Sequence, residues 1–199
     1  PVRHFGQRRS KAVTAPPRFG YPAFETERLH LRPPTDADIP SYQRGFADYE
    51  VIGHLARHVP WPYPEDGVAT FFRDILYPGI AAGRKWFWVL ALKEDPGTVV
   101  GAVDLWRDGK PENRGFWLAR AHWGKGLMSE AVAPVTAYAF EALGFEALVF
   151  ANAVGNARSR RIKEKQGARL VRVEPAAFVD PRYTEHEVWE LTRREWERR

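Results

Sequence analysis

Two glycines flank a lysine near the middle of the chain, in the segment 124–126, directly before a run with helical spacing. A helix N-terminus leaves backbone N–H groups unpaired and carries the positive end of the helix dipole, so it can hold a phosphate group. Glycines let the backbone approach the phosphate closely, and Lys125 adds a cation. The same residues equally suit a tight turn that only caps a helix. Their spacing matches neither a P-loop nor the three-glycine dinucleotide fingerprint.

A second polar group, Asn156 and Ser159, opens another predicted helix and is followed by Lys163. An asparagine amide and a serine hydroxyl can bind a ligand or donate a proton. Both are also ordinary helix-capping residues, so capping alone remains an alternative for each of them.

Metal and thiol chemistry find little support in the sequence. The chain has no cysteine, which excludes disulfides, thiolate catalysis and cysteine-bound zinc. His54 and His58 are four residues apart, a spacing that suits a shared metal on one helix, but no third ligand accompanies them. We therefore expect no metal site.

The elements that position these residues follow from hydrophobic periodicity. Alternating or β-branched runs predict strands, and apolar residues at helical spacing predict helices. The expected strands are 28–32, 85–92, 98–106, 113–119, 147–153, 168–174 and 185–192, and the expected helices are 36–49, 66–77, 125–143 and 156–166. Thr35 with Asp38 reads as a helix cap. Pro134 removes one backbone bond, so we expect helix on both sides of it, with or without a bend. Helices between hairpin-linked strands indicate a mixed sheet covered by helices.

Composition and charge favour one soluble domain with a basic arm. The 199 residues are 44% hydrophobic and 28% charged, as in a globular protein with a single core. The longest apolar run, 86–92, is too short to cross a membrane. The net charge is +5, and residues 1–23 contain five basic residues and no acidic one, so the remainder is neutral. We expect 1–23 to be a flexible arm, with weak RNA contact as the alternative, and 24–199 to be one domain. Without a signal peptide or cysteines, we expect a cytoplasmic protein.

From about Phe24 to Trp196 the chain resembles the GNAT acetyltransferases, in particular the branch that acetylates the N-terminal alanine of ribosomal proteins. The resemblance rests on motifs in a shared order: Glu25-Thr26-Glu27-Arg28-Leu29-His30-Leu31-Arg32, Gly115-Phe116-Trp117-Leu118, Trp123-Gly124-Lys125-Gly126, Ser129-Glu130-Ala131, Asn156-x-x-Ser159, Glu164-Lys165-x-Gly167 and Arg194-Glu195-Trp196. It implies a mixed α/β fold with a mostly antiparallel, twisted central sheet that splays at the acetyl-CoA site and has helices on both faces.

The resemblance also implies acetyl-CoA as the donor, without a metal, and assigns residues to it. The pantetheine arm would lie along one strand, the pyrophosphate would lie on the turn, and Asn156 would hold the arm from the other side. These cofactor-binding residues are Phe116, Trp117, Leu118, His122, Trp123, Gly124, Lys125, Gly126, Leu127, Met128, Asn156 and Ser159. Trp61 and Tyr63, in a proline-rich loop, would contact the acceptor.

Two positions depart from the family pattern. Many relatives carry a tyrosine as general acid where this chain has Lys163, which leaves Ser159 as the candidate acid. Many relatives also carry a glutamate as base where this chain has Asn113. The base is therefore unassigned, with Asp104 and Glu50 as the carboxylates considered.

The implied reaction is direct attack of an amine on acetyl-CoA. A protein N-terminal α-amine, from a ribosomal or other protein, is the first choice of acceptor, and a small amine, an amino acid or an antibiotic is the alternative. A non-catalytic module that binds acyl-CoA is the alternative of another class. The protein is expected to act as a monomer or homodimer.

Overall fold

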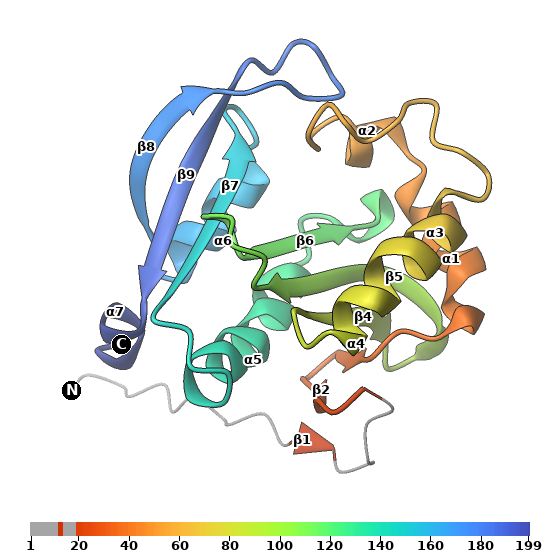
Figure 1. The fold of residues 1–199 in the computed structure, drawn as a ribbon, viewed down its shortest axis with the longest axis horizontal. Helices are drawn as coiled ribbons and strands as arrows, with labels where there is room; N and C mark the ends of the chain where they lie inside the picture. Colours follow the sequence, from red (N-terminus) through yellow and green to blue (C-terminus); the bar gives the residue numbers. More distant parts are fainter. Residues whose placement is uncertain (1–11, 14–18) are drawn as a thin grey trace.

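The backbone is organised around two antiparallel sheets that share no strand. The computed structural model describes residues 12–13 and 19–199. Within these residues one sheet has the order β1-β2-β3-β4-β5-β6 and the other the order β7-β9-β8, and the two diverge in Figure 1. The strands are β1 (Ala12–Val13), β2 (Ala23–Glu25), β3 (Leu29–Arg32), β4 (Lys85–Leu92), β5 (Asp95–Trp106), β6 (Arg114–Leu118), β7 (Ala147–Ala153), β8 (Arg169–Pro175) and β9 (Glu185–Thr192). The expected splayed, mostly antiparallel sheet is confirmed.

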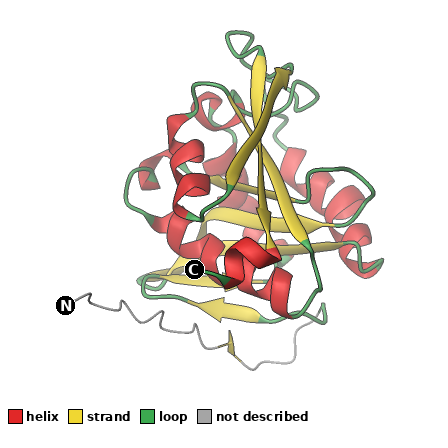
Figure 2. Ribbon diagram, turned by 90° about the vertical axis from the view of Figure 1, so that its left-hand side faces the viewer, coloured by secondary structure: helices red, strands yellow, loops and turns green. Residues whose placement is uncertain are grey.

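Helices cover both sides of the larger sheet, as Figure 2 shows. They are α1 (Ile39–Phe46), α2 (Tyr49–Ile52), α3 (Gly67–Phe71), α4 (Tyr77–Ala81), α5 (Leu127–Glu141), α6 (Ala157–Lys165) and α7 (Arg193–Glu197). The cap expected before α1 is confirmed: the buried Asp38 carboxylate accepts from the Thr35 N–H at 2.7 Å and from Arg32 at 2.6 Å. The start of α1 is thereby fixed to the end of β3. No helix among the described residues is both long and apolar enough to cross a membrane.

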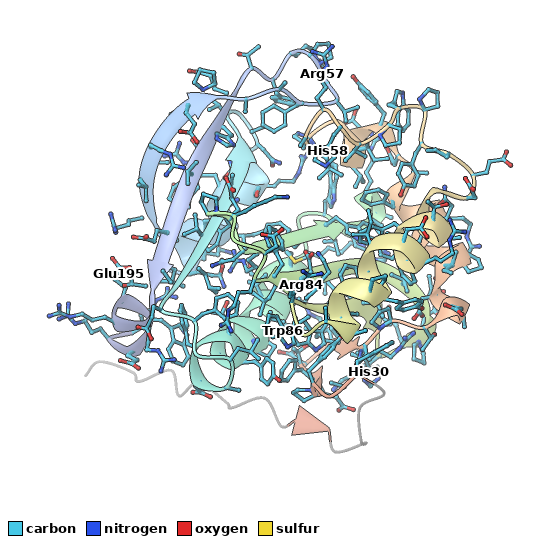
Figure 3. All side chains as sticks on the ribbon, in the orientation of Figure 1. His30, Arg57, His58, Arg84, Trp86 and Glu195 are labelled. Carbon is cyan, nitrogen blue, oxygen red and sulfur yellow. The ribbon has the colours of Figure 1, made fainter. Side chains whose placement is uncertain are left out.

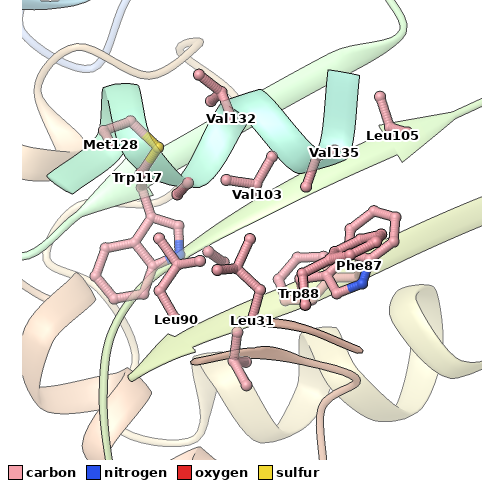
Figure 4. Packing of buried hydrophobic residues seen from close by; sticks show 14 of the residues in the cluster. Leu31, Phe87, Trp88, Leu90, Val103, Leu105, Trp117, Met128, Val132 and Val135 are labelled. Carbon is pink, nitrogen blue, oxygen red and sulfur yellow. The ribbon is translucent and has the colours of Figure 1, made fainter. Parts of the chain in front are cut away.

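The core lies where α5 packs on β3, β4 and β5. Figure 4 shows Met128, Val132 and Val135 of α5 against Leu31 of β3 and Val103 of β5, and all five side chains are buried. Each such side chain contributes about 1.5–3 kcal/mol by leaving water. The helix is continuous through Pro134, so helix on both sides of the proline is confirmed.

Asn113, directly before β6, forms hydrogen bonds that join the two sheets. The Asn113 backbone N–H donates to the Val149 carbonyl at 2.9 Å. Its side-chain amide donates to the Ala147 carbonyl at 3.0 Å and accepts from the Val149 N–H at 2.9 Å. Past this point β6 and β7 separate (Figure 1), because no ladder pairs them. Asn113 therefore ties β6 to β7 at the point where the two strands begin to separate.

Several expected boundaries differ from the structure. The helix expected over 66–77 runs on to Ala81 through a π-helical turn, Phe72–Leu76. Pro78 lies in the first turn of α4, directly after the π-helical turn. The helix expected up to 49 ends at Phe46, because the Asp48 side chain accepts from Glu50 N–H and starts α2 instead. Helix α7 was not expected at all.

The packed body also includes residues before Phe24. Tyr21 is 2% exposed and donates to the Phe87 carbonyl at 2.8 Å, and Trp88 donates to the Pro22 carbonyl at 2.7 Å. Ala12–Val13 pairs with β2. The rest of the expected basic arm, 1–11 and 14–18, lies outside the described residues.

Candidate active site

The glycine turn lies between β6 and α5, as the sequence predicts. Gly124 and Gly126 have φ values of +75° and +79°, a left-handed conformation that favours glycine, and α5 starts at Leu127. A Cβ added at Gly124 would meet nothing within 4 Å. The turn is exposed at 124–126, and the first N–H groups of α5 have no intrahelical partners. An anion can therefore reach the start of α5.

Arg28, which sequence analysis did not single out as functional, fixes the shape of this turn. It donates to the Lys125 carbonyl at 2.9 Å and pairs with Glu130, in the first turn of α5, at 2.7 Å. Burial raises the pKa of Glu130, but hydrogen bonds from Thr26 and Arg28 outweigh it and hold that pKa below its usual range. The ion pair neutralises Glu130, which would otherwise repel an anion at this helix end.

The start of α6 presents the second set of expected residues. The Asn156 side chain accepts from the Ser159 N–H at 3.2 Å, so the capping role considered for Asn156 is present. Ser159 is 9% exposed, and its hydroxyl oxygen accepts from Lys163 Nζ at 2.7 Å.

A stacked pair brings these two segments together. The Arg158 guanidinium of α6 lies 3.9 Å from the ring centroid of Trp123, in the glycine turn. The Trp123 indole N–H in turn donates to the Leu118 carbonyl at the end of β6 at 2.7 Å. The end of β6 and the turn thus form one surface with the start of α6, which lies about thirty residues further along the chain. Sequence analysis did not identify Arg158 as a functional candidate. Its position, two residues after the capping Asn156, was the one sequence feature that could have indicated it.

The proline-rich loop that carries Trp61 and the loop between β8 and β9 line a partly open cavity of about 570 Å³. The loops are tied together by backbone bonds, Arg57 N–H to Ala177 and Val179 N–H to Leu55. Most of the residues that line it have apolar or aromatic side chains, although their polar atoms contribute about as much of its surface, and among the described lining residues Arg57 is basic and none is acidic. Figure 3 labels Arg57 and His58 on this loop.

The two aromatic residues expected at an acceptor site are placed differently. Trp61 lines the cavity, is 43% exposed and packs against the ring of Tyr49. Tyr63 packs instead edge-on against Phe46, at 5.1 Å between ring centroids, and borders the hydrophobic core. It is not among the residues that line the cavity.

Comparison with known proteins places this arrangement in a family. A family model described as "Acetyltransferase (GNAT) domain" matches residues 28–169. The chain belongs to the GNAT acetyltransferase family. Over 84 residues it is 31% identical to "Putative ribosomal N-acetyltransferase YdaF" of Bacillus subtilis (strain 168), a match covering 42% of this chain and 46% of the relative. The aligned part is thus less than half the length of that relative.

Solved structures share the GNAT fold at low identity. The ribosomal-protein-S5-alanine acetyltransferase from Vibrio fischeri matches with a TM-score of 0.73 and 16% identity, over 87% of this chain and 98% of that chain. The spermidine N-acetyltransferase from Vibrio cholerae, in complex with CoA and spermine, matches with a TM-score of 0.70 and 16% identity, over 85% and 98%. These likenesses show the fold alone, and proteins named for different acceptors share it.

The carboxylates considered as a base in this GNAT protein have other partners or lie open to solvent. Asp104 is paired with Lys85 at 2.8 Å, with both side chains largely buried. Glu50 is exposed on α2. Among residues 12–13 and 19–199, no three potential metal ligands lie together; the His54 ring instead packs 4.9 Å from that of Tyr183.

Proposed function

We propose that this GNAT protein is an acetyl-CoA-dependent N-acetyltransferase whose acceptor is a protein N-terminal α-amine. The observation that carries the proposal is the meeting of three features where β6 and β7 diverge. These are the glycine turn at the start of α5, the exposed cations beside it and the first turn of α6.

The residues present fit acetyl-CoA. Open space at Gly124, with exposed Lys125 and Arg158 nearby, suits a pyrophosphate at the start of α5. Segment 116–118 belongs to β6, the edge strand of the larger sheet, so its outward N–H and C=O groups, apart from the Leu118 carbonyl that accepts from Trp123, are available to the amides of the pantetheine arm. The Asn156 amide N–H₂ remains to bind the arm from the α6 side. When bound, acetyl-CoA would supply a thioester carbonyl that an amine can attack.

Replacing Arg158 by alanine is expected to weaken acetyl-CoA binding about tenfold, because it removes a cation beside the turn and the stack that holds Trp123. Calorimetric titration with acetyl-CoA measures the effect. Arg161→Ala, which removes an exposed cation from the same helix, is the control and should bind like the wild type. Equal affinity of the two variants would contradict a role for Arg158.

An α-amine needs little help from a catalytic base to become neutral. Its ordinary pKa is about 7.7–8.0, so roughly a tenth or more is neutral at pH 7, whereas a lysine amine at about 10.4 is almost fully charged. Water can carry away the proton of such an amine, and the paired Asp104 is not required as a base. Ser159, beside Asn156, is positioned as the proton donor to the departing thiolate.

The cavity supports a peptide acceptor over a polyamine. Trp61 and Phe178 offer apolar and aromatic walls to a side chain near the N-terminus, and Arg57 would repel a polycation. A carboxylate early in the peptide would instead be attracted. YdaF, named a putative ribosomal N-acetyltransferase, and the Vibrio fischeri enzyme, named for ribosomal protein S5, are consistent with a protein substrate.

An acceptor panel with acetyl-CoA tests the function. Peptides that begin Ala-Asp should be acetylated at the α-amine about tenfold more efficiently in kcat/KM than peptides that begin Ala-Lys, and spermidine should be a poor acceptor. Arg57→Glu should reverse the preference. Arg84→Glu makes the same change of charge at an exposed site that lies well away from Arg57 in Figure 3, and it should leave the preference intact.

Other results of the panel contradict the proposal in distinct ways. Spermidine as the best acceptor would make the protein a small-amine acetyltransferase. Binding of acetyl-CoA without transfer to any amine would make it a regulatory acyl-CoA-binding module.

A further inference from the structure

Lys163 is the most deeply buried amine among the described residues. Its side chain is 1% exposed, and its Nζ lies 5.6 Å and 5.8 Å from the ring centroids of Phe116 and Phe150. Within the part of the chain that the structure describes, Nζ makes one hydrogen bond to a side chain, which it donates to Ser159 Oγ at 2.7 Å. Lysine is seldom fully buried unless it has a partner. This position therefore calls for an explanation beyond packing.

Two charged groups act on Lys163 in opposite directions. Arg114 of β6, which is buried and retains unpartnered Nε and Nη2 atoms, disfavours the protonated amine, whereas Glu187 of β9 favours it. On α6 itself, Arg160 is paired with Glu187 at 2.9 Å. From β7 the neighbouring group is the uncharged Phe150 ring. The Thr136 hydroxyl of α5, also uncharged, accepts hydrogen bonds from Arg114 and Gln166. Burial, then Arg114, hold the pKa of Lys163 well below its usual range.

Ser159 by itself is a poor proton donor to a thiolate. A serine hydroxyl is a far weaker acid than a thiol of pKa about 8.5, so a lone serine that protonated a thiolate would be left as an unstable alkoxide. Ser159 Oγ here accepts a hydrogen bond from Lys163, so its own proton is free to point to another acceptor. A proton can move from Nζ to Oγ as the hydroxyl proton leaves.

We propose that Lys163 is a positioning and proton-supplying residue that acts through Ser159 on the departing thiolate, an inference that rests on the proposed acetyltransferase function. The C–N bond to the acceptor forms and the C–S bond breaks. The sulfur takes the proton of Ser159 Oγ, and Oγ takes one from Lys163 Nζ, which becomes neutral. The surplus proton of the acceptor nitrogen goes to water, and water returns a proton to Lys163.

This relay gives the reaction a specific pH dependence. Lys163 must be charged to supply a proton, so kcat should fall as pH rises through its lowered pKa.

Lys163→Met is the variant that tests the relay. Methionine has a similar length and suits the rings of Phe116 and Phe150. We expect kcat to fall by about 10²-fold, an unchanged KM for acetyl-CoA, and loss of the alkaline fall in kcat. Ser159→Ala should behave alike, and the double variant should be no slower than either single variant. Lys165→Met, at an exposed position of the same helix, should match the wild type.

Unfolding without acetyl-CoA gives a second measurement that does not depend on activity. Because the folded pKa of Lys163 is lowered, the unfolded chain binds more protons between that value and about 10.4. The wild type should therefore gain stability relative to Lys163→Met as pH rises through this window. Below the window the difference should be constant.

Separate outcomes overturn the relay and the proposed function. If Lys163→Met keeps its kcat and its alkaline fall, Lys163 has no part in proton transfer. If Lys163→Met does not fold, an unaltered pH profile in Ser159→Ala overturns the relay equally. If the wild type transfers no acetyl group, the acetyltransferase function itself fails, and the relay fails with it.

Discussion

Gly124→Glu is expected to lose at least 100-fold in affinity for acetyl-CoA. The new carboxylate would stand in the open space beside the start of α5, where the proposal places the pyrophosphate. Like charges at such close range cost several kcal/mol, and about 2.8 kcal/mol corresponds to 100-fold. Calorimetric titration with acetyl-CoA gives the affinity, and thermal unfolding shows whether the variant is folded.

Any side chain at Gly124 strains the backbone, and a substitution at the other end of α5 serves as a control for this strain. Gly144 has a φ of +68°, close to the +75° of Gly124, and a Cβ there would also meet nothing within 4 Å. Gly144→Glu should therefore lose a similar stability, about 1–2 kcal/mol, and bind acetyl-CoA normally. Undiminished binding by Gly124→Glu would remove the turn from the donor site.

Elements whose signals are local in sequence could be predicted well. Strands β4, β7 and β9 have the bounds that alternation and β-branched residues indicate, Lys85–Leu92, Ala147–Ala153 and Glu185–Thr192. The cap of Thr35 with Asp38 and the glycine turn at 124–126 are local as well, since each depends on residues within one turn of helix.

Helix α7 was missed although a local signal was present. The Thr192 hydroxyl and Glu195 form a reciprocal cap, with the Glu195 carboxylate accepting from the Thr192 N–H at 2.8 Å. This threonine lies at the end of a strongly alternating strand, and the strand pattern drew attention away from the cap that follows it.

Contacts between distant segments could not be predicted, because nothing in a single sequence pairs them. The stack of Arg158 on Trp123 joins residues whose roles had been considered separately. The burial of Lys163 had no signal either: a lysine on a short, highly charged helix is normally read as exposed, and only the packing of α6 against β6 and β7 encloses it.

The role of Asn113 could not be predicted from the sequence either, because it also depends on contacts with a distant strand. From sequence it was noted only as the residue that replaces a glutamate of many relatives. In the structure its amide bonds both Ala147 and Val149 of β7. A carboxylate could accept from the Val149 N–H but could not donate to the Ala147 carbonyl. The residue that cannot act as a base is thus the one suited to joining the two sheets.

Asn113→Ala is therefore expected to lower the free energy of unfolding by about 2–4 kcal/mol. It leaves the Val149 N–H and the Ala147 carbonyl without these bonds, and each unpaired, partly buried group costs about 1–3 kcal/mol. For a domain of this size that corresponds to a fall in Tm of roughly 5–15 °C. Denaturant and thermal unfolding measure the loss.

The same variant should also weaken acetyl-CoA binding in the protein that remains folded, because the separation of β6 and β7 is set at Asn113. Of the bonds that join the strands there, only the one from the Asn113 N–H to the Val149 carbonyl would remain. Glu112→Ala, which removes the neighbouring side chain and none of these bonds, should keep both stability and affinity. If Asn113→Ala is as stable as Glu112→Ala, the amide bonds do not hold the split, and its geometry must come from the packing of α5 and α6 on the two sheets.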